Sequence, residues 1–446
     1  MLALRREAPL PDRVSVGMRG ALAEWGSMPP KQAMISVSRP VVIALLSLCK
    51  NSSMLKAFKV RIYPTDEQSI TLAKHFGCTR WLWNHCLSVM TETYKTTGKG
   101  VSAFTMKKQI PVLKIEHEWL KECYSQCLQQ SVLNLSQAFQ NFFEGRAKYP
   151  NFKSKHHRQS VQFPQNVKVL SNSVIKFPGS LGSVAAKIHR TINGVLKTVT
   201  VSRNPDGKYF ASLLVEEGTA NPEVSGDGKA IGIDLGLTDF AITSDGSKFA
   251  NPRHLKKHER NLKRKQRKLS RRSKGSNNRN KARLKVAKVH SKIARVREDF
   301  HHKLSRKIVN ENQVIVVEDL AVKNMVKNHN LAKAISDVGW AQFCTMLKYK
   351  AEFEGKIYVE IGRFFPSSHL CSNTLLPLEK MDLSVRSFVC PHCQERHDRD
   401  INAAINIKNE GLRILASGSG ASALGRDVRP KGGRRKSTLS EAVAVD

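Results

Sequence analysis

The sequence has 446 residues, of which 74 are Lys or Arg and 37 are Asp or Glu, so its formal net charge is +37. This excess is far larger than solubility requires and predicts a polyanionic partner, either nucleic acid or an anionic membrane surface. A hydrophobic content of 40% excludes a purely disordered basic tail, and no apolar run approaches the ~20 residues that span a bilayer.

The first 53 residues differ in character from the rest of the chain. They are rich in Ala, Pro, Ser and Arg and show no sustained hydrophobic periodicity. At Met54 the pattern changes to apolar residues that alternate with basic ones, which predicts a strand over 54–64. We expect Met54 to be the native start and 1–53 to be a non-native extension; the alternative is a flexible N-terminal arm.

Residues 65–149 have the periodicity of helices. Thr65 suits a helix N-cap, and the apolar residues that follow recur three and four positions apart. Aromatic residues at this spacing favour a packed core over a base-stacking surface. One such apolar face consists of Val132, Leu135, Phe139 and Phe142.

Residues 150–225 change to short β-like runs separated by turns at Asn193-Gly194 and Asp206-Gly207. Together with the strand over 54–64 they predict a small β-barrel. The predicted strands cover 160–163, 173–177, 195–202 and 209–216.

A second group of strands is predicted at 231–234, 239–243, 248–249, 314–317 and 357–361, and residues 334–355 are expected to be helical. Asp234 ends the first of these strands, and Glu318 directly follows the fourth. Asp400 opens a predicted helix over 400–412, whose small alanines allow close packing on a sheet. Two neighbouring strands and one packed helix would bring the three carboxylates together.

Residues 252–307 are the most basic part of the chain, with 23 Lys or Arg against three acids. Leu255, Leu262 and Leu269 repeat every seven residues. A second apolar seam consists of Val286, Val289, Ile293, Val296 and Phe300. A break at 273–278 separates the two, which predicts a basic antiparallel helical hairpin. A charge run is usually a solvated face, but this density of one sign favours contact with phosphates.

Three carboxylates gathered in a partly buried site repel one another and raise one another's pKa. Divalent cations remove this conflict, because Mg²⁺ prefers oxygen ligands, and two ions ~3.5–4 Å apart activate water and stabilise a leaving 3′ oxygen. Asp234, Glu318 and Asp400 therefore predict a metal-dependent nuclease. Taken separately, each acid has an ordinary alternative: a turn, a surface ion pair and a helix N-cap, respectively.

Cysteines are the second set of candidate metal ligands. Nine cysteines at uneven spacing argue against a secreted disulfide framework and favour a reducing interior. Cys390 and Cys393 form a C-x₂-C knuckle suited to zinc, with Cys371 upstream. The alternative is a degenerate knuckle held by its own packing. The candidates for a fourth zinc ligand are His369, His392 and His397.

In these motifs the chain resembles the TnpB (OrfB) family, the RNA-guided DNA endonucleases of insertion sequences, which are related to type V CRISPR effectors. The resemblance covers about 54–412. Its motifs stand here as Gly232-Ile233-Asp234-Leu235-Gly236, Val316-Val317-Glu318-Asp319-Leu320 and His397-Asp398-Arg399-Asp400-Ile401-Asn402-Ala403-Ala404, with 335–340 and Pro366-Ser367-Ser368 between them.

The resemblance implies an α/β multidomain protein with an RNase H-like (RuvC-type) nuclease core in 226–363 and 398–412. A disordered tail is expected over 413–446. The other implied parts are a helical recognition domain at 65–149, a wedge β-barrel at 54–64 and 150–225, and a zinc-ribbon-like insert for target nucleic acid at 364–397.

The resemblance assigns Asp234, Glu318 and Asp400 to a catalytic triad that uses two Mg²⁺ ions, or Mn²⁺, and leaves Asp398 as the motif's non-catalytic acid. It implies a guide RNA and a double-stranded DNA target as partners. It also implies a monomeric ribonucleoprotein without membrane attachment, in the cytoplasm and associated with the nucleoid. Thr374 stands where the family has the second cysteine of its first pair, which leaves zinc binding in question.

Two further functions remain open. A nuclease-inactive, RNA-guided DNA-binding repressor would use the same scaffold, but it predicts the loss of a triad acid, and all three are present. A transposase acting directly in strand transfer is compatible with the same core, although the Asp–Glu–Asp order favours a nuclease. We therefore predict an RNA-guided DNA endonuclease that hydrolyses phosphodiester bonds and supports maintenance of its insertion sequence.

Overall fold

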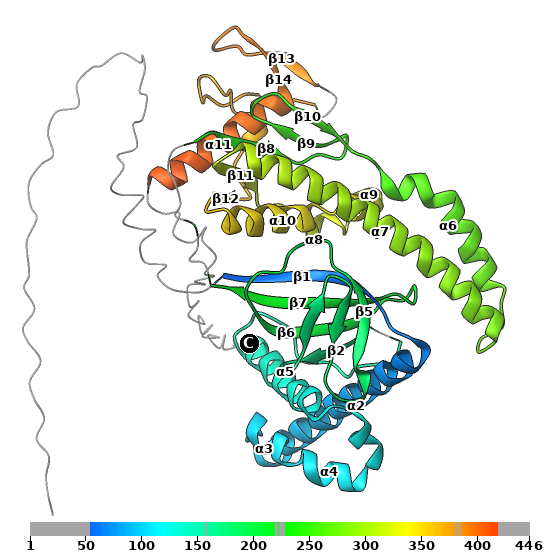
Figure 1. Cartoon of the computed structure of the whole chain (residues 1–446). Coiled ribbons are helices and arrows are strands. Elements are labelled where there is room, and N and C mark those ends of the chain that lie inside the picture. The colour runs from blue at the N-terminus through cyan, green and yellow to red at the C-terminus, as the bar shows by residue number, and fades with distance from the viewer. Residues whose placement is uncertain are drawn as a thin grey trace, which may run out of the picture. The chain divides into compact units, whose positions relative to one another are not determined.

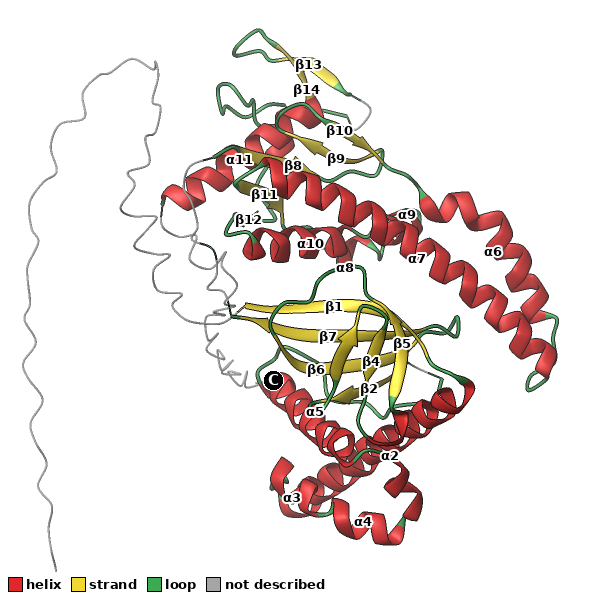
Figure 2. Ribbon diagram, in the orientation of Figure 1, coloured by secondary structure: helices red, strands yellow, loops and turns green. Residues whose placement is uncertain are grey.

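The computed structural model describes residues 54–156, 158–218, 222, 228–379, 381–382 and 385–417. The predicted N-terminal extension and most of the predicted tail lie outside these residues. Two assemblies of strands and helices are each built on a sheet of their own (Figure 1; Figure 2). In the described part of the chain, no helix combines the length and the apolar character needed to cross a bilayer.

The first assembly contains a seven-stranded antiparallel sheet in the order β2-β6-β7-β1-β5-β4-β3. Its edges are β2 and β3, so closure into a barrel stays a prediction. The two short strands β3 and β5 were not predicted. The strands are β1 (Met54–Tyr63), β2 (Gln159–Phe163), β3 (Lys168–Ser171), β4 (Val174–Lys176), β5 (Ser183–Lys187), β6 (Val195–Arg203) and β7 (Tyr209–Glu217).

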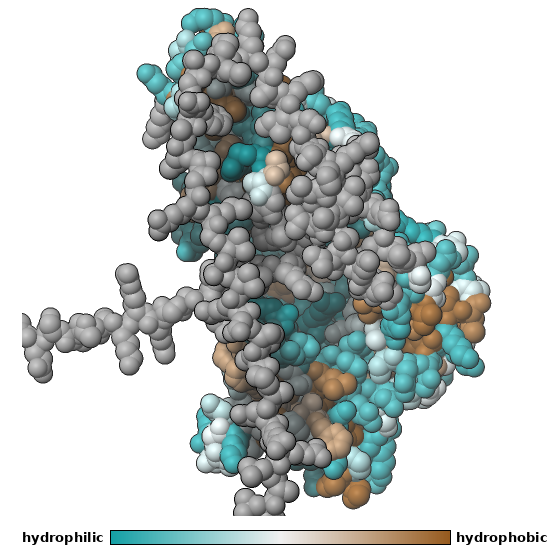
Figure 3. All heavy atoms as spheres, turned by 90° about the vertical axis from the view of Figure 1, so that its left-hand side faces the viewer, coloured by the Kyte–Doolittle hydropathy of each residue, from teal (hydrophilic) through white to brown (hydrophobic). Residues whose placement is uncertain are grey.

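Helices complete this assembly: α2 (Asp66–Thr97), α3 (Ala103–Lys108), α4 (Ile110–Glu116), η1 (Glu118–Glu122) and α5 (Ser125–Phe143). Thr65 caps α2 as predicted, and Gln68 completes a capping box with it. Of the predicted apolar face of α5, Val132, Leu135 and Phe139 join the core, whereas Phe142 does not. The next residue, Phe143, is 76% exposed. Separate hydrophobic patches are visible on the otherwise mainly hydrophilic described surface in Figure 3.

The second assembly contains a five-stranded sheet in the order β10-β9-β8-β11-β12. β8, β11 and β12 run parallel, and β9 and β10 are antiparallel. Helices pack on both faces (Figure 1), so the α/β prediction is confirmed. The strands are β8 (Ala230–Asp234), β9 (Asp239–Thr243), β10 (Lys248–Ala250), β11 (Val314–Glu318) and β12 (Ile357–Ile361).

The helices of this assembly are α6 (His254–Ser270), α7 (Asn277–Glu311), α8 (Val322–Met325), α9 (Ala332–Val338), α10 (Trp340–Phe353) and α11 (Arg399–Ala416). α7 and α10 pack on one face of the sheet and α11 on the other. Residues 334–355 are largely helical as predicted, but Gly339, with φ of 71°, divides the segment into α9 and α10. α11 continues to Ala416, so the predicted disorder at 413–416 is wrong.

α6 and α7 form the predicted basic hairpin. Leu262, Val289 and Ile293 are buried along its seam, whereas the predicted seam residue Val296 is 36% exposed. The short elements between β12 and α11 are η3 (Ser367–His369) and the hairpin of β13 (Ser387–Val389) and β14 (Arg396–Asp398).

Gly232 lets α11 approach β8 closely. A Cβ added at Gly232 would lie 2.1 Å from the backbone oxygen of Ala404 and 2.6 Å from the backbone nitrogen of Lys408. We therefore expect Gly232→Ala to lower the free energy of unfolding by about 1–3 kcal/mol. Gly77→Ala is the matched control, because nothing lies within 4 Å of its added Cβ and Ala in a helix stabilises by about 0.5–1 kcal/mol relative to Gly. Urea unfolding of the full chain measures both changes. If the free energy of unfolding changed in the same direction in both variants, the close packing at Gly232 would be contradicted.

Candidate active site

Asp234 and Glu318 lie at the ends of two adjacent parallel strands. β8 and β11 pair with Ile233 opposite Val317, so the next residue of each strand is Asp234 or Glu318. Ile233 and Val317 are fully buried, whereas the two acids are only partly buried. The parallel register therefore brings two carboxylates to one edge of the sheet.

Asp400 reaches this site from the first turn of α11. The N-cap is Asp398, whose Oδ1 accepts hydrogen bonds from the backbone N–H groups of Asp400 and Ile401, each at 3.1 Å. Its Oδ2 accepts a 2.6 Å bond from Nζ of Lys248 on β10. Asp398 thus anchors the start of α11, and the N-cap alternative for Asp400 is wrong.

Asp234 interacts electrostatically with both Glu318 and Asp400. Burial, together with the negative charges of Glu318 and Asp400, raises the pKa of Asp234 to about 7. The backbone N–H of Leu235 and the charge of Arg399 oppose this shift. Three full negative charges at neutral pH therefore require a compensating cation.

Asp234→Asn is expected to stabilise the chain when no divalent cation is added. A carboxyl group whose folded pKa lies above its unfolded value destabilises the folded state increasingly as the pH rises from about 4 to about 7. The gain from Asp234→Asn should therefore be larger at pH 8 than at pH 5.5, reaching roughly 2 kcal/mol after allowance for partial exposure. Urea unfolding at both pH values measures it, with Asp299→Asn as an exposed control on α7. A gain that did not change with pH would contradict this origin.

Two residues at the site were not assigned a role from the sequence. Ser367 donates a 2.5 Å hydrogen bond from Oγ to Oε1 of Glu318, 49 positions away in the chain. Arg386 places Nη1 3.6 Å from Oδ2 of Asp400 and has 61% of its side chain exposed. An exposed guanidinium beside a carboxylate site is suited to binding a phosphate. Ser367 belongs to the Pro-Ser-Ser motif, which was the only signal available.

The cysteine–histidine cluster lies in the segment between β12 and α11. Sγ of Cys371 is 3.7 Å from Sγ of Cys393, and Nε2 of His397 is 3.8 and 3.5 Å from these two sulfurs, respectively. Cys390 is fully buried and its thiol interacts with both Cys371 and Cys393. Of the three candidate histidines, the structure therefore brings His397 to the cysteines. His392 instead faces the backbone oxygen of Pro377 at 3.4 Å.

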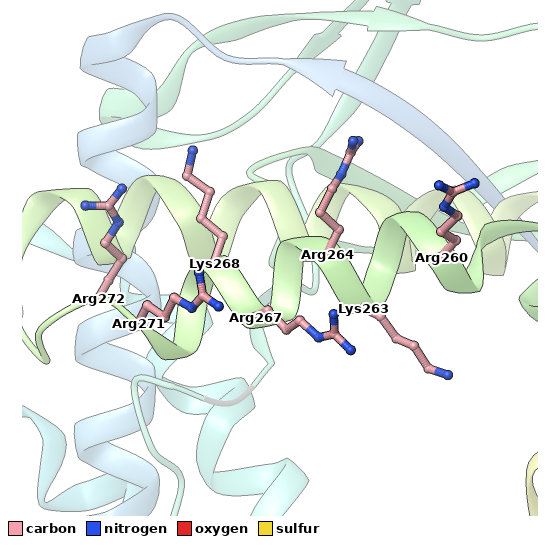
Figure 4. A pocket seen from close by; sticks show the side chains of 7 residues that line it. All are labelled: Arg260, Lys263, Arg264, Arg267, Lys268, Arg271 and Arg272. Carbon is pink, nitrogen blue, oxygen red and sulfur yellow. The ribbon is translucent and has the colours of Figure 1, made fainter.

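One side of α6 carries a dense array of cations. Figure 4 shows these side chains in two neighbouring rows, each with a spacing of four residues. Among the described residues, Glu259 pairs with Lys263, and no acid lies within salt-bridge distance of the other six. We call this array the basic face of α6; it consists of Arg260, Lys263, Arg264, Arg267, Lys268, Arg271 and Arg272.

Three family models match parts of the chain. The model described as "Probable transposase" matches 212–329, and the one described as "Cas12f1-like, TNB domain" matches 340–407. A model described as "Helix-turn-helix domain" matches 54–99. In the structure, that range contains β1 and the single helix α2.

Curated relatives match over most of the chain. "Putative RNA-guided DNA endonuclease" of Streptomyces pristinaespiralis is 40% identical, over 84% of this chain and 92% of the relative. "Putative RNA-guided DNA endonuclease InsQ" of Escherichia coli (strain K12) is 31% identical, over 82% of this chain and 94% of the relative. A solved Cas12f1–sgRNA–target DNA complex covers 80% of this chain and 99% of its own, at 13% identity and a TM-score of 0.44. The two curated relatives and the matching family models show that the chain belongs to the TnpB (OrfB) family.

Proposed function

We propose that this chain is an RNA-guided DNA endonuclease that hydrolyses phosphodiester bonds. The observation that carries the proposal is the charge conflict at Asp234, whose pKa is raised to about 7 by burial and by the charges of Glu318 and Asp400. The names of the two curated relatives describe the same activity. We identify these three acids as the catalytic residues.

The three acids fit Mg²⁺ or Mn²⁺, because all the donors are carboxylate oxygens, and a cation offsets the repulsion that raises the Asp234 pKa. A pair of such ions supplies an activated water and stabilises the leaving 3′ oxygen. The sheet order β10-β9-β8-β11-β12, with its parallel and antiparallel parts, supports an RNase H-like (RuvC-type) core.

Other side chains of the site have separate roles in this proposal. Ser367 donates a hydrogen bond to Glu318, and Asp398 holds the helix that carries Asp400. Arg386 is exposed beside Asp400 and binds a phosphate of the DNA strand that enters the site.

The partners follow from charge. A guide RNA and double-stranded DNA are the polyanions that the net charge of +37 and the basic face of α6 accommodate. In this arrangement the helical block 65–149 is the recognition domain, the seven-stranded sheet is the wedge domain, and 364–397 contacts target nucleic acid. We propose a monomeric ribonucleoprotein.

Zinc fits the cysteine–histidine cluster. Two ligands 2.3 Å from a tetrahedral zinc lie about 3.8 Å apart, and a sulfur–nitrogen pair lies slightly closer. The observed separations of 3.5 to 3.8 Å among Cys371, Cys393 and His397 agree with this geometry. With Cys390 the set becomes three cysteines and one histidine, and His397 replaces the ligand that Thr374 does not provide.

His397→Ala is expected to weaken zinc binding by more than about 100-fold, because it removes a direct ligand and even indirect supports are worth 10–100-fold. His392→Ala is the matched control, since its ring faces Pro377 instead. Zinc content per chain, measured by mass spectrometry after competition with a chelator, checks the assignment. Full zinc content in His397→Ala, or loss in His392→Ala, would show that the ligand set is different.

A transposase acting directly in strand transfer is the second candidate, since one matching family model is described as "Probable transposase". A nuclease-inactive repressor is disfavoured, because the three acids are present and electrostatically joined.

One experiment separates these functions. The RNA that co-purifies with the full chain is sequenced, and the complex is incubated in Mg²⁺ with a plasmid that carries the matching target. We expect linearised plasmid. Joined strand-transfer products without RNA would support the transposase, and binding without cleavage would support the repressor.

A further inference from the structure

Residues 367–372 connect the two candidate metal centres, and we call this segment the strap. At its start, Oγ of Ser367 donates a 2.5 Å hydrogen bond to Oε1 of Glu318. Near its end, Cys371 contributes its thiol to the cysteine–histidine cluster. Only three residues of chain therefore separate a contact with the acid from a member of the cluster.

Two asparagines of α11 fasten the strap. Nδ2 of Asn406 donates to the backbone oxygens of Ser367 and Leu370, both at 2.8 Å. Nδ2 of Asn402 donates to the oxygen of Leu370 at 2.7 Å, and its Oδ1 accepts from the backbone N–H of Ser372 at 2.7 Å. Both asparagines are 1% exposed. They lie one turn apart on the helix that also carries Asp400, so one helix face holds the whole strap.

These hydrogen bonds fix the position of the strap more than they stabilise the fold. Buried polar groups cost free energy unless they are hydrogen-bonded, and hydrogen bonds in a low-dielectric interior are strong and directional. Oδ1 of Asn406 has no partner among the described residues, so this amide is only partly satisfied. An apolar side chain in place of Asn406 would avoid that cost but would remove the donor to the Ser367 carbonyl, whereas Leu370 would keep its bond from Asn402. The asparagines therefore determine where Ser367 and Cys371 lie relative to Asp400.

We propose that Ser367 is a positioning residue for Glu318 and that the strap couples the cysteine–histidine cluster to the carboxylate site. A hydroxyl that donates to one carboxylate oxygen restricts rotation of the carboxylate and leaves the other oxygen for a cation. Asn406 binds the backbone of Ser367, and both asparagines bind the backbone of Leu370, directly before Cys371. Because one helix face holds both ends of the strap, a change in the cluster alters the orientation of Glu318. The proposal rests on the proposed function, in which Glu318 binds a divalent cation.

The test measures Mn²⁺ affinity of the full chain without RNA by calorimetry, and the Mg²⁺ concentration for half-maximal cleavage with RNA. We expect Ser367→Ala to weaken both by about 10-fold, as removal of an indirect metal support does. Ser367→Thr keeps the hydroxyl and should restore most of the affinity. Ser368→Ala is the matched control on the same turn and should leave both values unchanged.

A double-mutant cycle tests the coupling. Cys393→Ser disturbs the cluster at a residue outside the strap. It should weaken Mn²⁺ binding in the wild-type background but have little further effect with Ser367→Ala. If the two substitutions weakened Mn²⁺ binding independently, so that their fold-changes multiplied, the coupling would be overturned. Wild-type Mn²⁺ affinity in Ser367→Ala would overturn the positioning role. Glu318→Gln separates a failure of this proposal from a failure of the proposed function. If this variant binds Mn²⁺ like wild type, the proposed metal site itself is wrong.

Discussion

Cleavage of a guide-matched plasmid is expected to fall by about a thousandfold or more when Asp234, Glu318 or Asp400 is changed to its amide. Metal ions supply several kcal/mol of transition-state stabilisation, and each 1.36 kcal/mol lost is about tenfold in rate. The amides keep the size of the side chains, so the affinities for guide RNA and target DNA should stay within about threefold of wild type, which is less than about 1 kcal/mol. Single-turnover cleavage assays and binding assays in the same buffer separate the two effects.

Neighbouring acids provide the controls for this prediction. Asp398→Asn should lose less than about tenfold in rate, because Asn is also a good N-cap residue and still accepts the bonds that begin α11. Asp299→Asn, an exposed acid on α7, should cleave at the wild-type rate. An Asp400→Asn variant that cleaves normally beside an inactive Asp398→Asn would mean that the third ligand is Asp398.

Neutralising the basic face of α6 should weaken guide RNA binding by about 100- to 1,000-fold at physiological salt. Each lost phosphate contact removes roughly one unit from the slope of log K against log salt concentration. Glutamine keeps the helix propensity of arginine, so the helix itself should persist. We expect this slope to become less steep by about three when four arginines become glutamine: Arg260, Arg264, Arg267 and Arg271.

A charge-matched control distinguishes this surface from the overall charge of the chain. Four exposed lysines outside the hairpin can be changed to glutamine, which lowers the net charge equally: Lys95, Lys99, Lys327 and Lys348. Titration of RNA binding between 50 and 300 mM salt should show a small change for this control. Equal loss in both variants would mean that long-range attraction, rather than contact at α6, determines RNA affinity.

The parallel strands of the second assembly could be predicted because each is a mainly apolar run. Parallel strands buried on both faces give such runs, as in Val314–Glu318 and Ile357–Ile361. β3 and β5 were missed because neither is a continuous apolar run: β3 is exposed throughout, and β5 buries only alternate residues. The break at Gly339 was missed because Gly also occurs within helices, and only the backbone shows its left-handed conformation.

The site was predictable in its acids and not in its supporting contacts. Asp234 and Glu318 stand out as charges at the ends of apolar strands, which is a local signal. The bond from Ser367 to Glu318 and the approach of Arg386 to Asp400 join distant parts of the chain. His397 was one of three candidates from the sequence, and only the fold distinguishes it from the others.

RNA guidance is tested most directly by changing the guide. The full chain is prepared with its sequenced RNA and, in parallel, with the same RNA whose ~20-nucleotide guide segment matches a second site. Both complexes are given one plasmid that carries both targets, in Mg²⁺. We predict that the cut moves to the second site with the altered RNA and that both cuts disappear in Asp234→Asn. A cut that stays at the first site, or that forms without RNA, would contradict RNA-guided cleavage.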